Sequence, residues 1–352
     1  MTGIRVVVTG ATGNVGTSLV SALADDERVG TVVGLARRRA EWGHPGVELS
    51  TVDVSRDDLE PVLAGADVVV HLAWLFQPTR DPATTWENNV IGSLRVFDAV
   101  AAAGVPALVY ASSVGAYSPG PKHPPVAEDW PTHGWPGAAY TREKAYLERV
   151  LDAFELAHPQ VRVVRMRPGF MFKRESASEQ RRLFAGPLLP GMLVRPWLVP
   201  LLPDLPGLRF QALHTSDAAD GFRRAVLGDV RGAVNLAAEP VVDVEVLAEL
   251  LDARAVPVSL PPVRAALAAA WKVHAVPAAP GLFDAVPRLP VMDCARARDE
   301  LGWAPRHSAR DALAEFLAGL REGAGLPTPP LAPRVEGGRL HELLRTGVGA
   351  RP

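Results

Sequence analysis

The chain has a single cysteine, Cys294, among its 352 residues. One cysteine excludes an internal disulfide framework, and no Cys/His cluster has the spacing of a zinc site, so we expect no metal. The most apolar region, 183–208, is interrupted by prolines, and no run approaches the roughly 20 apolar residues that span a bilayer. A net charge of -2 gives no electrostatic case for nucleic acid or an anionic membrane. A strand is expected from residue 4, which leaves no room for a signal peptide, and we expect a cytoplasmic protein.

Lysine and tyrosine are also scarce, with four of each in the chain. Tyr140 and Lys144 are four residues apart, about one helical turn, so in a helix they lie on one face. A nearby cation lowers the pKa of a tyrosine from its free value near 10, which lets the phenol exchange a proton with a carbinol or carbonyl. Chance gives such a pair roughly one time in twenty, and an exposed lysine beside a half-buried tyrosine is the alternative interpretation. The surrounding sequence decides between them.

The first half of the chain alternates strand patterns with helix patterns. Several strands are apolar on both faces, as in a parallel sheet. The expected strands are Ile4–Thr9, Thr31–Ala36, Val47–Asp53, Asp67–Ala73, Ala107–Ser113 and Arg162–Pro168, with helices near 14–26, 56–64, 84–103 and 137–157. This alternation predicts an α/β fold with a doubly wound parallel Rossmann sheet.

The second half is less regular. We expect strands at 208–214 and 233–237 and helices at 216–227, 241–255, 262–273, 294–301 and 308–321. The pattern predicts a Rossmann dinucleotide-binding domain over 1–175, to which 208–238 returns. A smaller mixed C-terminal substrate lobe would comprise 176–207 and 239–324. The tail, 325–352, is rich in Pro, Gly and Arg, and we expect it to be mobile or draped over the surface.

A glycine run stands at the first junction between strand and helix. Gly10 permits a tight turn, Gly13 lets the backbone approach a pyrophosphate, and Gly16 allows close packing of helix on strand. The amino end of the following helix offers free N–H groups and a partial positive charge to phosphates. The sequence therefore predicts a dinucleotide site that includes Gly10, Thr12, Gly13, Asn14, Val15 and Gly16.

The end of the second strand favours NADP over NAD as the cofactor. Folds that bind NAD usually place a carboxylate there for the ribose 2′-hydroxyl. Here Ala36 is followed by Arg37, Arg38 and Arg39, which could pair with a 2′-phosphate. Arginines are also common on solvated faces, so NAD stays the alternative.

Further motifs occur in a fixed order along residues 4 to about 320. They are Asp53-Val54, His71-Leu72-Ala73, Asn88-Asn89-Val90-Ile91-Gly92, Tyr110-Ala111-Ser112-Ser113, Tyr140-x-x-x-Lys144, Arg167-Pro168-Gly169, His214-x-x-Asp217 and Leu301-Gly302-Trp303. Together with the glycine run they resemble the extended short-chain dehydrogenase/reductases, the NAD-dependent epimerase/dehydratase group. The resemblance implies that the cofactor also contacts Asp53, Val54, Leu72, Ala73, Ala111, Pro168 and Gly169, and that Asn89 supports the active site.

The same resemblance assigns the catalytic residues. Tyr140 would exchange the proton on the substrate oxygen, and Lys144 would lower its pKa and bond the nicotinamide ribose. Ser113, with Ser112 as second choice, would hold the substrate oxygen and stabilise its developing charge. The alternative for Ser113 is a hydroxyl that caps nearby backbone.

The substrate is predicted from departures from the family pattern. Val114-Gly115 replace the Asp-Glu pair of the sugar dehydratases, which disfavours dehydration. Apolar residues follow the sixth strand where nucleotide-sugar epimerases usually carry an asparagine. We expect Trp74, Phe76, Ser113, Phe170 and Phe172 to contact a hydrophobic carbonyl or alcohol, with Trp197 as a further wall; ordinary core packing is the alternative. A sugar nucleotide stays an alternative substrate, because its diphosphate needs cationic partners and the chain offers Arg181, Arg182 and Arg195.

Two classes of function follow from these residues. The first is an NAD(P)-dependent oxidoreductase or epimerase that uses Ser113, Tyr140 and Lys144 on a small molecule, with a nucleotide-sugar epimerase as the alternative. The second is a non-catalytic dinucleotide sensor or scaffold. The helices near 84–103 and 137–157 resemble the pair through which this family usually dimerises, so a homodimer is a further hypothesis.

Overall fold

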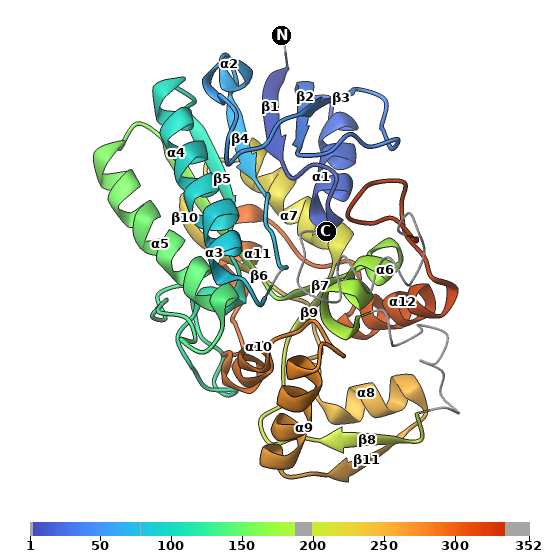
Figure 1. Ribbon diagram of the computed structural model, residues 1–352. Helices are drawn as coiled ribbons and strands as arrows, with labels where there is room; N and C mark the ends of the chain where they lie inside the picture. The colour runs from blue at the N-terminus through green and yellow to red at the C-terminus, as the bar shows by residue number, and fades with distance from the viewer. Residues whose placement is uncertain (1–2, 78, 187–198, 335–352) are drawn as a thin grey trace.

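A seven-stranded parallel sheet forms the centre of the computed structural model, which describes residues 3–77, 79–186 and 199–334. Its strands are β1 (Ile4–Thr9), β2 (Val29–Ala36), β3 (Val47–Thr51), β4 (Val68–His71), β5 (Ala107–Ala111), β6 (Arg162–Pro168) and β10 (Gly232–Leu236). They follow the order β10-β6-β5-β4-β1-β2-β3, and each neighbouring pair is parallel (Figure 1). The predicted doubly wound parallel sheet is confirmed.

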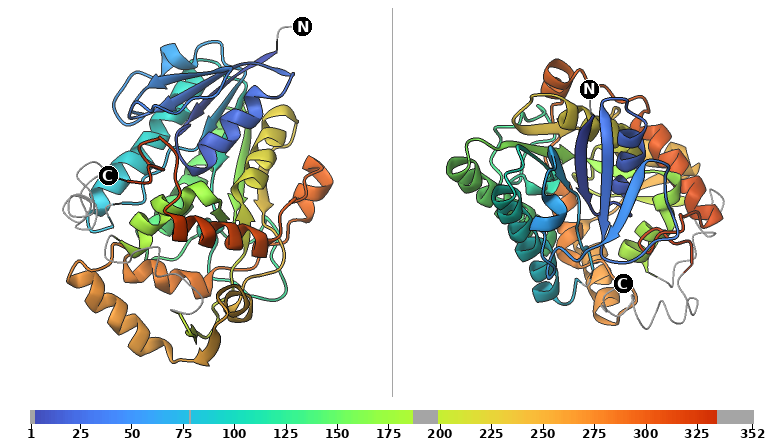
Figure 2. Two further views of the ribbon diagram at one scale, coloured as in Figure 1. Left: turned by 90° about the vertical axis from the view of Figure 1, so that its right-hand side faces the viewer. Right: turned by 90° about the horizontal axis from the view of Figure 1, so that it is seen from above.

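Alternate residues of β1 point into two different cores. Val6 and Val8 pack with one layer of helices, and Val7 packs with the other. The first layer contains α1 (Asn14–Ala24), α7 (Thr215–Leu227) and α11 (Ala295–Leu301). The second contains α2 (Glu60–Leu63), α4 (Gly92–Ala102) and α5 (Ala139–Ala157) (Figures 1 and 2). Burial on both faces explains the apolar runs of these strands.

The strand order reverses between β1 and β4. In an open parallel sheet, ligands bind in the crevice outside the carboxyl ends of the strands at such a point. Here the ends of β1 and β4 lead into Gly10 and Leu72. The topology therefore places the glycine turn and the chain after β4 beside one crevice.

The rest of the chain forms smaller units at this edge. β7 (Phe170–Phe172) pairs with β9 (Ala212–His214), and β8 (Leu201–Asp204) pairs with β11 (Arg254–Pro257). The helices here are α6 (Ala177–Gln180), α8 (Val244–Leu251), α9 (Leu260–Lys272), α10 (Pro280–Ala285) and α12 (Ala309–Glu322). Since β10 lies in the main sheet and α7 packs on it, the chain leaves the sheet after β6 and returns to it.

Two predicted helices are interrupted. The helix expected over 84–103 consists of α3 (Pro82–Trp86), a π-helical turn η1 (Glu87–Ile91) and α4. The helix expected over 241–255 ends at Leu251, because Asp252 adopts a left-handed conformation with φ 49° and the chain continues as β11. Helical periodicity alone does not reveal such local breaks.

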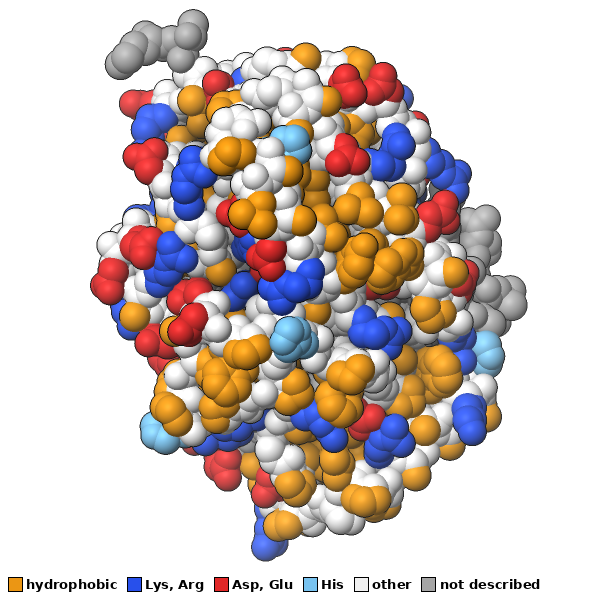
Figure 3. All heavy atoms as spheres, turned by 90° about the vertical axis from the view of Figure 1, so that its left-hand side faces the viewer, with side chains coloured by type: hydrophobic (Ala, Val, Ile, Leu, Met, Phe, Trp, Pro, Cys, Tyr) orange, Lys and Arg blue, Asp and Glu red, His pale blue; other side chains and the backbone are white. Residues whose placement is uncertain are grey.

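The outer face of α3 and α5 carries exposed aromatic side chains. Trp86 and Tyr146 are 39% and 43% exposed, and their ring centroids are 5.0 Å apart. Figure 3 faces this side of the molecule and shows hydrophobic side chains among charged ones. The homodimer stays a prediction. Within the described part of the chain, no helix has the length and apolar character needed to cross a membrane.

Candidate active site

The glycine turn after β1 is shaped by close backbone contacts. Gly10 has a φ of +72°, and a Cβ on Gly16 would lie 2.2 Å from the carbonyl oxygen of Gly10. A Cβ on Gly13 would meet only that same oxygen, at 3.4 Å, and no side chain caps the amino end of α1. The Gly13 backbone is thus open to close approach beside uncapped N–H groups, an arrangement that fits a pyrophosphate.

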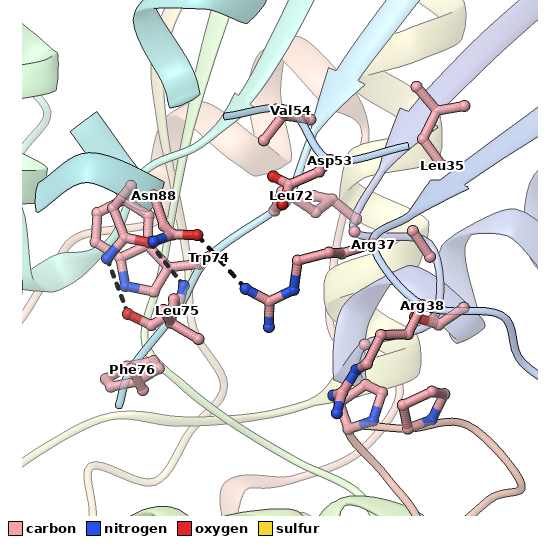
Figure 4. Close-up of a pocket in the computed structure, with 18 of the residues that line it drawn as sticks. Leu35, Arg37, Arg38, Asp53, Val54, Leu72, Trp74, Leu75, Phe76 and Asn88 are labelled. Carbon is pink, nitrogen blue, oxygen red and sulfur yellow. Dashed lines mark hydrogen bonds between the residues drawn. The ribbon is translucent and has the colours of Figure 1, made fainter. Parts of the chain in front are cut away.

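A cavity of about 280 Å³ extends from this turn along the carboxyl edge of the sheet. Figure 4 shows Arg37, Arg38 and Asp53 toward one end and Trp74, Leu75 and Phe76 toward the other. Across it, Arg37 Nη1 lies 3.4 Å from Asn88 Oδ1. Of the residues predicted to bind the cofactor, ten line this cavity: Gly10, Thr12, Gly13, Arg37, Arg38, Asp53, Val54, Leu72, Ala73 and Asn89.

The other predicted cofactor residues lie outside this cavity. Asn14 is held by Thr215 Oγ1 and the Met171 carbonyl, and Val15 packs on the core. Gly16 supports the turn, and a Cβ on Gly169 would lie 2.6 Å from the Gln211 carbonyl oxygen. The remaining ones are Ala111, Tyr140, Lys144 and Pro168, which belong to β5, α5 and β6.

A second cavity, of about 270 Å³, lies on the far side of residues 74–76. Its lining is mostly apolar and includes Tyr140 together with aromatic and aliphatic side chains. The lining residues are Trp74, Leu75, Phe76, Thr79, Pro82, Thr85, 137–140, Arg142, Glu143, Trp271 and 279–282. Each cavity is slightly smaller than the roughly 300–1,000 Å³ typical of small-molecule sites. The segment 74–76 therefore separates two spaces that would make one site if joined.

Ser113 lies beside Tyr140, which lines the second cavity, while Ser113 itself lines neither of the two cavities. The Ser113 hydroxyl favours the ionised form of the neighbouring Tyr140 phenol, and it accepts a hydrogen bond of 3.0 Å from the Gly115 N–H. Gly115 is needed for this contact, because a Cβ there would lie 2.7 Å from a ring carbon of Tyr140. Ser112, the second choice, instead donates to Glu148 Oε1 at 2.6 Å and is buried. The geometry favours Ser113 as the partner of the tyrosine.

Lys144 does not approach the phenol in the way the sequence predicts. Its ammonium donates to the Ala111 carbonyl at 2.6 Å and lies 3.5 Å from the ring centroid of Trp74. Burial lowers the pKa of Lys144 to about 7, while the indole face and the carboxylates of Glu143 and Glu148 favour the charged form. Tyr140 and Lys144 share a helix face, but the long lysine side chain follows β5 instead.

The expected lowering of the Tyr140 pKa is therefore wrong for this arrangement. Burial raises the pKa of Tyr140 to about 12, the neighbouring Ser113 hydroxyl opposes this rise, and the negative charge of Glu143 adds to it. The ring of Phe76 stacks on Tyr140 at 4.6 Å between centroids, and Trp74 meets its edge at 5.7 Å. Aromatic side chains thus cover both the phenol ring and the ammonium.

Several predicted substrate residues have other surroundings. Phe170 packs against Phe210 and Phe172 against Phe316, with ring centroids 5.1 and 4.9 Å apart, so neither lines these two cavities. Their core packing matches the alternative interpretation. Trp197 and Arg195 lie outside the described residues. Trp74 and Phe76 line both cavities, and their contact with a substrate stays a prediction.

The first part of the tail closes one side of the first cavity, where Pro329 and Pro330 form part of the wall. The guanidinium of the buried Arg182 donates to the carbonyl oxygens of Pro330 and Ala332, each at 2.6 Å. Leu331 is fully buried, so residues 325–334 are draped in a fixed path (Figure 2, left). Residues 335–352 lie outside the described chain. The sequence offered no signal for this wall.

Known proteins resemble this chain in both sequence and fold. The model of the NAD dependent epimerase/dehydratase family matches residues 6–193, more than half of the chain. The chain belongs to this family. An uncharacterized protein of Mycobacterium tuberculosis is 27% identical over 327 residues, which is 92% of this chain but 31% of that protein. This chain thus spans about a third of that relative.

Two further comparisons concern characterised members. L-arabinose 1-dehydrogenase (NAD(P)(+)) of Haloferax volcanii is 37% identical over 110 residues, 31% of this chain and 41% of that protein. The structure of Thermus thermophilus UDP-glucose 4-epimerase in complex with NAD has a TM-score of 0.67 at 19% identity, covering 90% of this chain and 99% of that one. At this identity the likeness shows the fold of the epimerase/dehydratase family alone.

One acidic residue at the family's dinucleotide cavity was not predicted. Glu179 of α6 lines the wall next to Arg182, and burial raises the pKa of its carboxyl to about 7. A carboxyl that is protonated about half of the time near neutral pH repels phosphate less than one that is always ionised. Among the described residues, no group of His, Cys, Asp or Glu is arranged to hold a metal ion.

Two glycine substitutions separate binding from folding at the turn. Gly13→Ala adds a methyl group that the fold accommodates, so we expect stability within about 1 kcal/mol of wild type and NADPH binding at least tenfold weaker. Gly16→Ala forces a methyl group against the Gly10 carbonyl, and we expect a loss of about 1–3 kcal/mol or more of unfolding free energy. Urea unfolding and calorimetric titration measure both. Wild-type NADPH affinity in Gly13→Ala would show that the turn does not hold a pyrophosphate.

The raised pKa of Tyr140 is testable on the protein alone. Because burial disfavours the phenolate, Tyr140 should ionise at higher pH than free tyrosine, whose pKa is near 10. The difference in phenolate absorbance between wild type and Tyr140→Phe, followed against pH, isolates this group from the other three tyrosines. Circular dichroism at each pH verifies that both proteins are folded. A midpoint below 10 contradicts the expected shift.

Proposed function

We propose that this chain is an NAD(P)-dependent oxidoreductase or epimerase that acts at a carbon–oxygen centre of a hydrophobic carbonyl or alcohol. The observation that carries the proposal is Tyr140 in the lining of the second cavity, with Ser113 beside it and Lys144 one helical turn away. This cavity shares the wall 74–76 with the cavity that begins at the glycine turn. A sensor or scaffold needs the dinucleotide cavity but not this set of side chains, so the set favours an enzyme.

The proposed chemistry divides among three side chains. Tyr140 gives its proton to, or takes it from, the substrate oxygen, and Ser113 donates a hydrogen bond to the same oxygen as its charge changes. Lys144, whose side chain lies along β5, would bond the nicotinamide ribose. When bound, the nicotinamide dinucleotide supplies or takes up a hydride. Gly10, Gly13 and the amino end of α1 would hold its pyrophosphate, and Leu72 and Ala73 would lie along it.

The second cavity supports a hydrophobic substrate. Trp74, Phe76 and Trp271 contribute its aromatic walls, and Arg142, the one arginine in its described lining, donates to the Pro136 carbonyl. Arg182 already donates to the tail, and Arg181 donates to the Gly186 carbonyl at 3.0 Å. A sugar nucleotide brings a diphosphate that needs cationic partners, and these contacts favour an apolar substrate over it.

A nucleotide-sugar epimerase is the second candidate, because solved relatives such as the Thermus enzyme carry that activity. The two candidates differ in the fate of the cofactor. Incubation with NADPH and a panel of hydrophobic ketones gives net cofactor oxidation if the chain is a reductase. Incubation with UDP-glucose and NAD gives an inverted sugar without net reduction if it is an epimerase.

Replacement of the tyrosine tests the proposed chemistry. Tyr140→Phe removes the exchanging proton, so we expect turnover to fall by roughly 10²–10⁴-fold while dinucleotide affinity stays within about threefold. Tyr146→Phe, on the exposed face of the same helix, is the matched control and should turn over like wild type. Steady-state kinetics with the substrate found in the panel give the comparison. Near-normal turnover of Tyr140→Phe would remove the proposed mechanism.

We propose NADP as the preferred cofactor, because Arg37 and Arg38 line the cavity where the second strand ends and no carboxylate stands at that position. A charge-assisted hydrogen bond to a 2′-phosphate contributes about 1.5–3 kcal/mol. Arg37→Ala/Arg38→Ala should therefore weaken NADPH binding roughly ten- to hundredfold and NADH binding far less. Arg39→Ala, outside the cavity lining, is the control. Tighter binding of NADH than of NADPH by wild type would overturn this preference.

A further inference from the structure

Glu143 is a buried carboxylate that the proposed chemistry leaves without a role. It lies between Tyr140 and Lys144 on α5 and is only 3% exposed. Its Oε1 accepts a hydrogen bond of 2.6 Å from Thr85 Oγ1, and its Oε2 accepts one of 2.7 Å from Asn89 Nδ2. A buried carboxylate is costly unless it is well bonded, and these two donors come from a different part of the chain.

Asn89 links Glu143 to the segment between the two cavities, because its side chain also bonds Leu75. Its Nδ2 also donates to the Leu75 carbonyl at 2.8 Å, and its Oδ1 accepts from the Leu75 N–H at 2.7 Å. Both amide hydrogens of Asn89 are thus used. If the Asn89 side-chain amide were flipped, so that its oxygen and nitrogen exchanged places, the oxygen would face the Glu143 carboxylate and repel it. The carboxylate therefore fixes the orientation in which Asn89 bonds both the N–H and the carbonyl of Leu75.

Leu75 in turn places its two aromatic neighbours. Trp74 covers the Lys144 ammonium and Phe76 stacks on Tyr140. The indole N–H of Trp74 is buried without a hydrogen-bond partner in the described chain, so no hydrogen bond of its own holds the ring. The position of the ring depends on packing and on the clamp at the adjacent Leu75 backbone.

We propose that Glu143 is a positioning residue that acts through Asn89 and Leu75 to hold Trp74 and Phe76 against Lys144 and Tyr140. The relevance of this role to turnover rests on the proposed function, but the role itself is a property of the folded chain. A solvent-exposed side chain at position 143, directly before Lys144, would not make these contacts and could not play this role.

The charge of Glu143 also acts on its surroundings. The groups that face it are Tyr140, Arg142 and Lys144 of α5, Tyr110 of β5, Thr85 of α3 and Asn89 of η1. Burial raises the pKa of Glu143, and the bonds from Asn89 and Thr85 and the nearby cations oppose this rise. Since its negative charge raises the pKa of Tyr140, neutralising it should let Tyr140 ionise at lower pH.

The first experiment reads the position of Trp74 without any substrate. In protein labelled with 5-fluorotryptophan, the resonance that Trp74→Phe removes is that of Trp74 among 8 tryptophans. Glu143→Gln should shift or broaden this resonance and move the ionisation of Tyr140 to lower pH. Glu155→Gln, about 18 Å further along the same helix, should do neither. An unchanged Trp74 resonance in Glu143→Gln, or an equal change in Glu155→Gln, overturns the proposal.

The second experiment exchanges the amide and the carboxylate between positions 89 and 143. Asn89→Asp alone sets two buried carboxylates against each other and should unfold the segment or the protein. In Asn89→Asp/Glu143→Gln, the introduced carboxylate accepts from the Leu75 N–H and from the introduced amide, while the Leu75 carbonyl loses its donor, so one of the two bonds to Leu75 is kept. The Trp74 resonance and the melting temperature should therefore recover in part. No recovery overturns the proposal.

Turnover separates this inference from the proposed function. Glu143→Gln should lower kcat by about ten- to hundredfold, because misplaced aromatic rings misalign the reacting groups. If the Trp74 resonance responds as expected while Tyr140→Phe turns over normally, the positioning role stands and the proposed function fails. If Tyr140→Phe is inactive and the Trp74 resonance is insensitive to Glu143, the proposed function stands and the positioning role fails.

Discussion

The hydrogen bonds that hold residues 72–77 are the constraint on which this site depends. After β4 the chain crosses the carboxyl edge of the sheet without regular structure, so its backbone groups need other partners. The Thr9 hydroxyl accepts from the N–H groups of Leu72 and Ala73, at 3.2 and 3.3 Å. Asn89 binds both backbone groups of Leu75, and Gln77 donates to the Leu183 carbonyl. The segment is thereby fixed at its start, middle and end.

A buried polar chain connects these anchors. His71 contacts Thr9 Oγ1 at 2.7 Å and Ser93 Oγ at 2.9 Å, and Ser93 contacts the Asn89 carbonyl. Burial and the charge of Lys144 lower the pKa of His71 to about 3, so this histidine is neutral and serves as a spacer. The π-helical turn η1 carries Asn89 at the place where it can reach Leu75 and Glu143 together. One network therefore sets the wall between the two cavities and the rings that cover Tyr140 and Lys144.

Features that depend on local sequence could be predicted, and those that depend on distant contacts could not. The parallel strands follow from apolar runs, and the turn follows from the spacing of Gly10, Gly13 and Gly16. The direction of the Lys144 side chain depends on an indole 70 residues earlier and on a carbonyl of β5, neither of which helical spacing encodes. The tail at Pro330 likewise meets Arg182 only in the folded chain. The motifs located the candidate reacting groups but not the aromatic side chains that cover them.

The position of the carboxylates argues against elimination chemistry at this site. Gly115 stands where a side chain would collide with the Tyr140 ring, so the loop after Ser113 cannot carry an acid–base pair without displacing the phenol. Glu143 is the acidic side chain in the described lining of the second cavity, yet its two oxygens already accept from Thr85 and Asn89. A carboxylate bound in this way orients its neighbours instead of exchanging protons with a substrate. In the proposed function, proton exchange is therefore assigned to Tyr140, and the proposed chemistry is confined to a single carbon–oxygen centre.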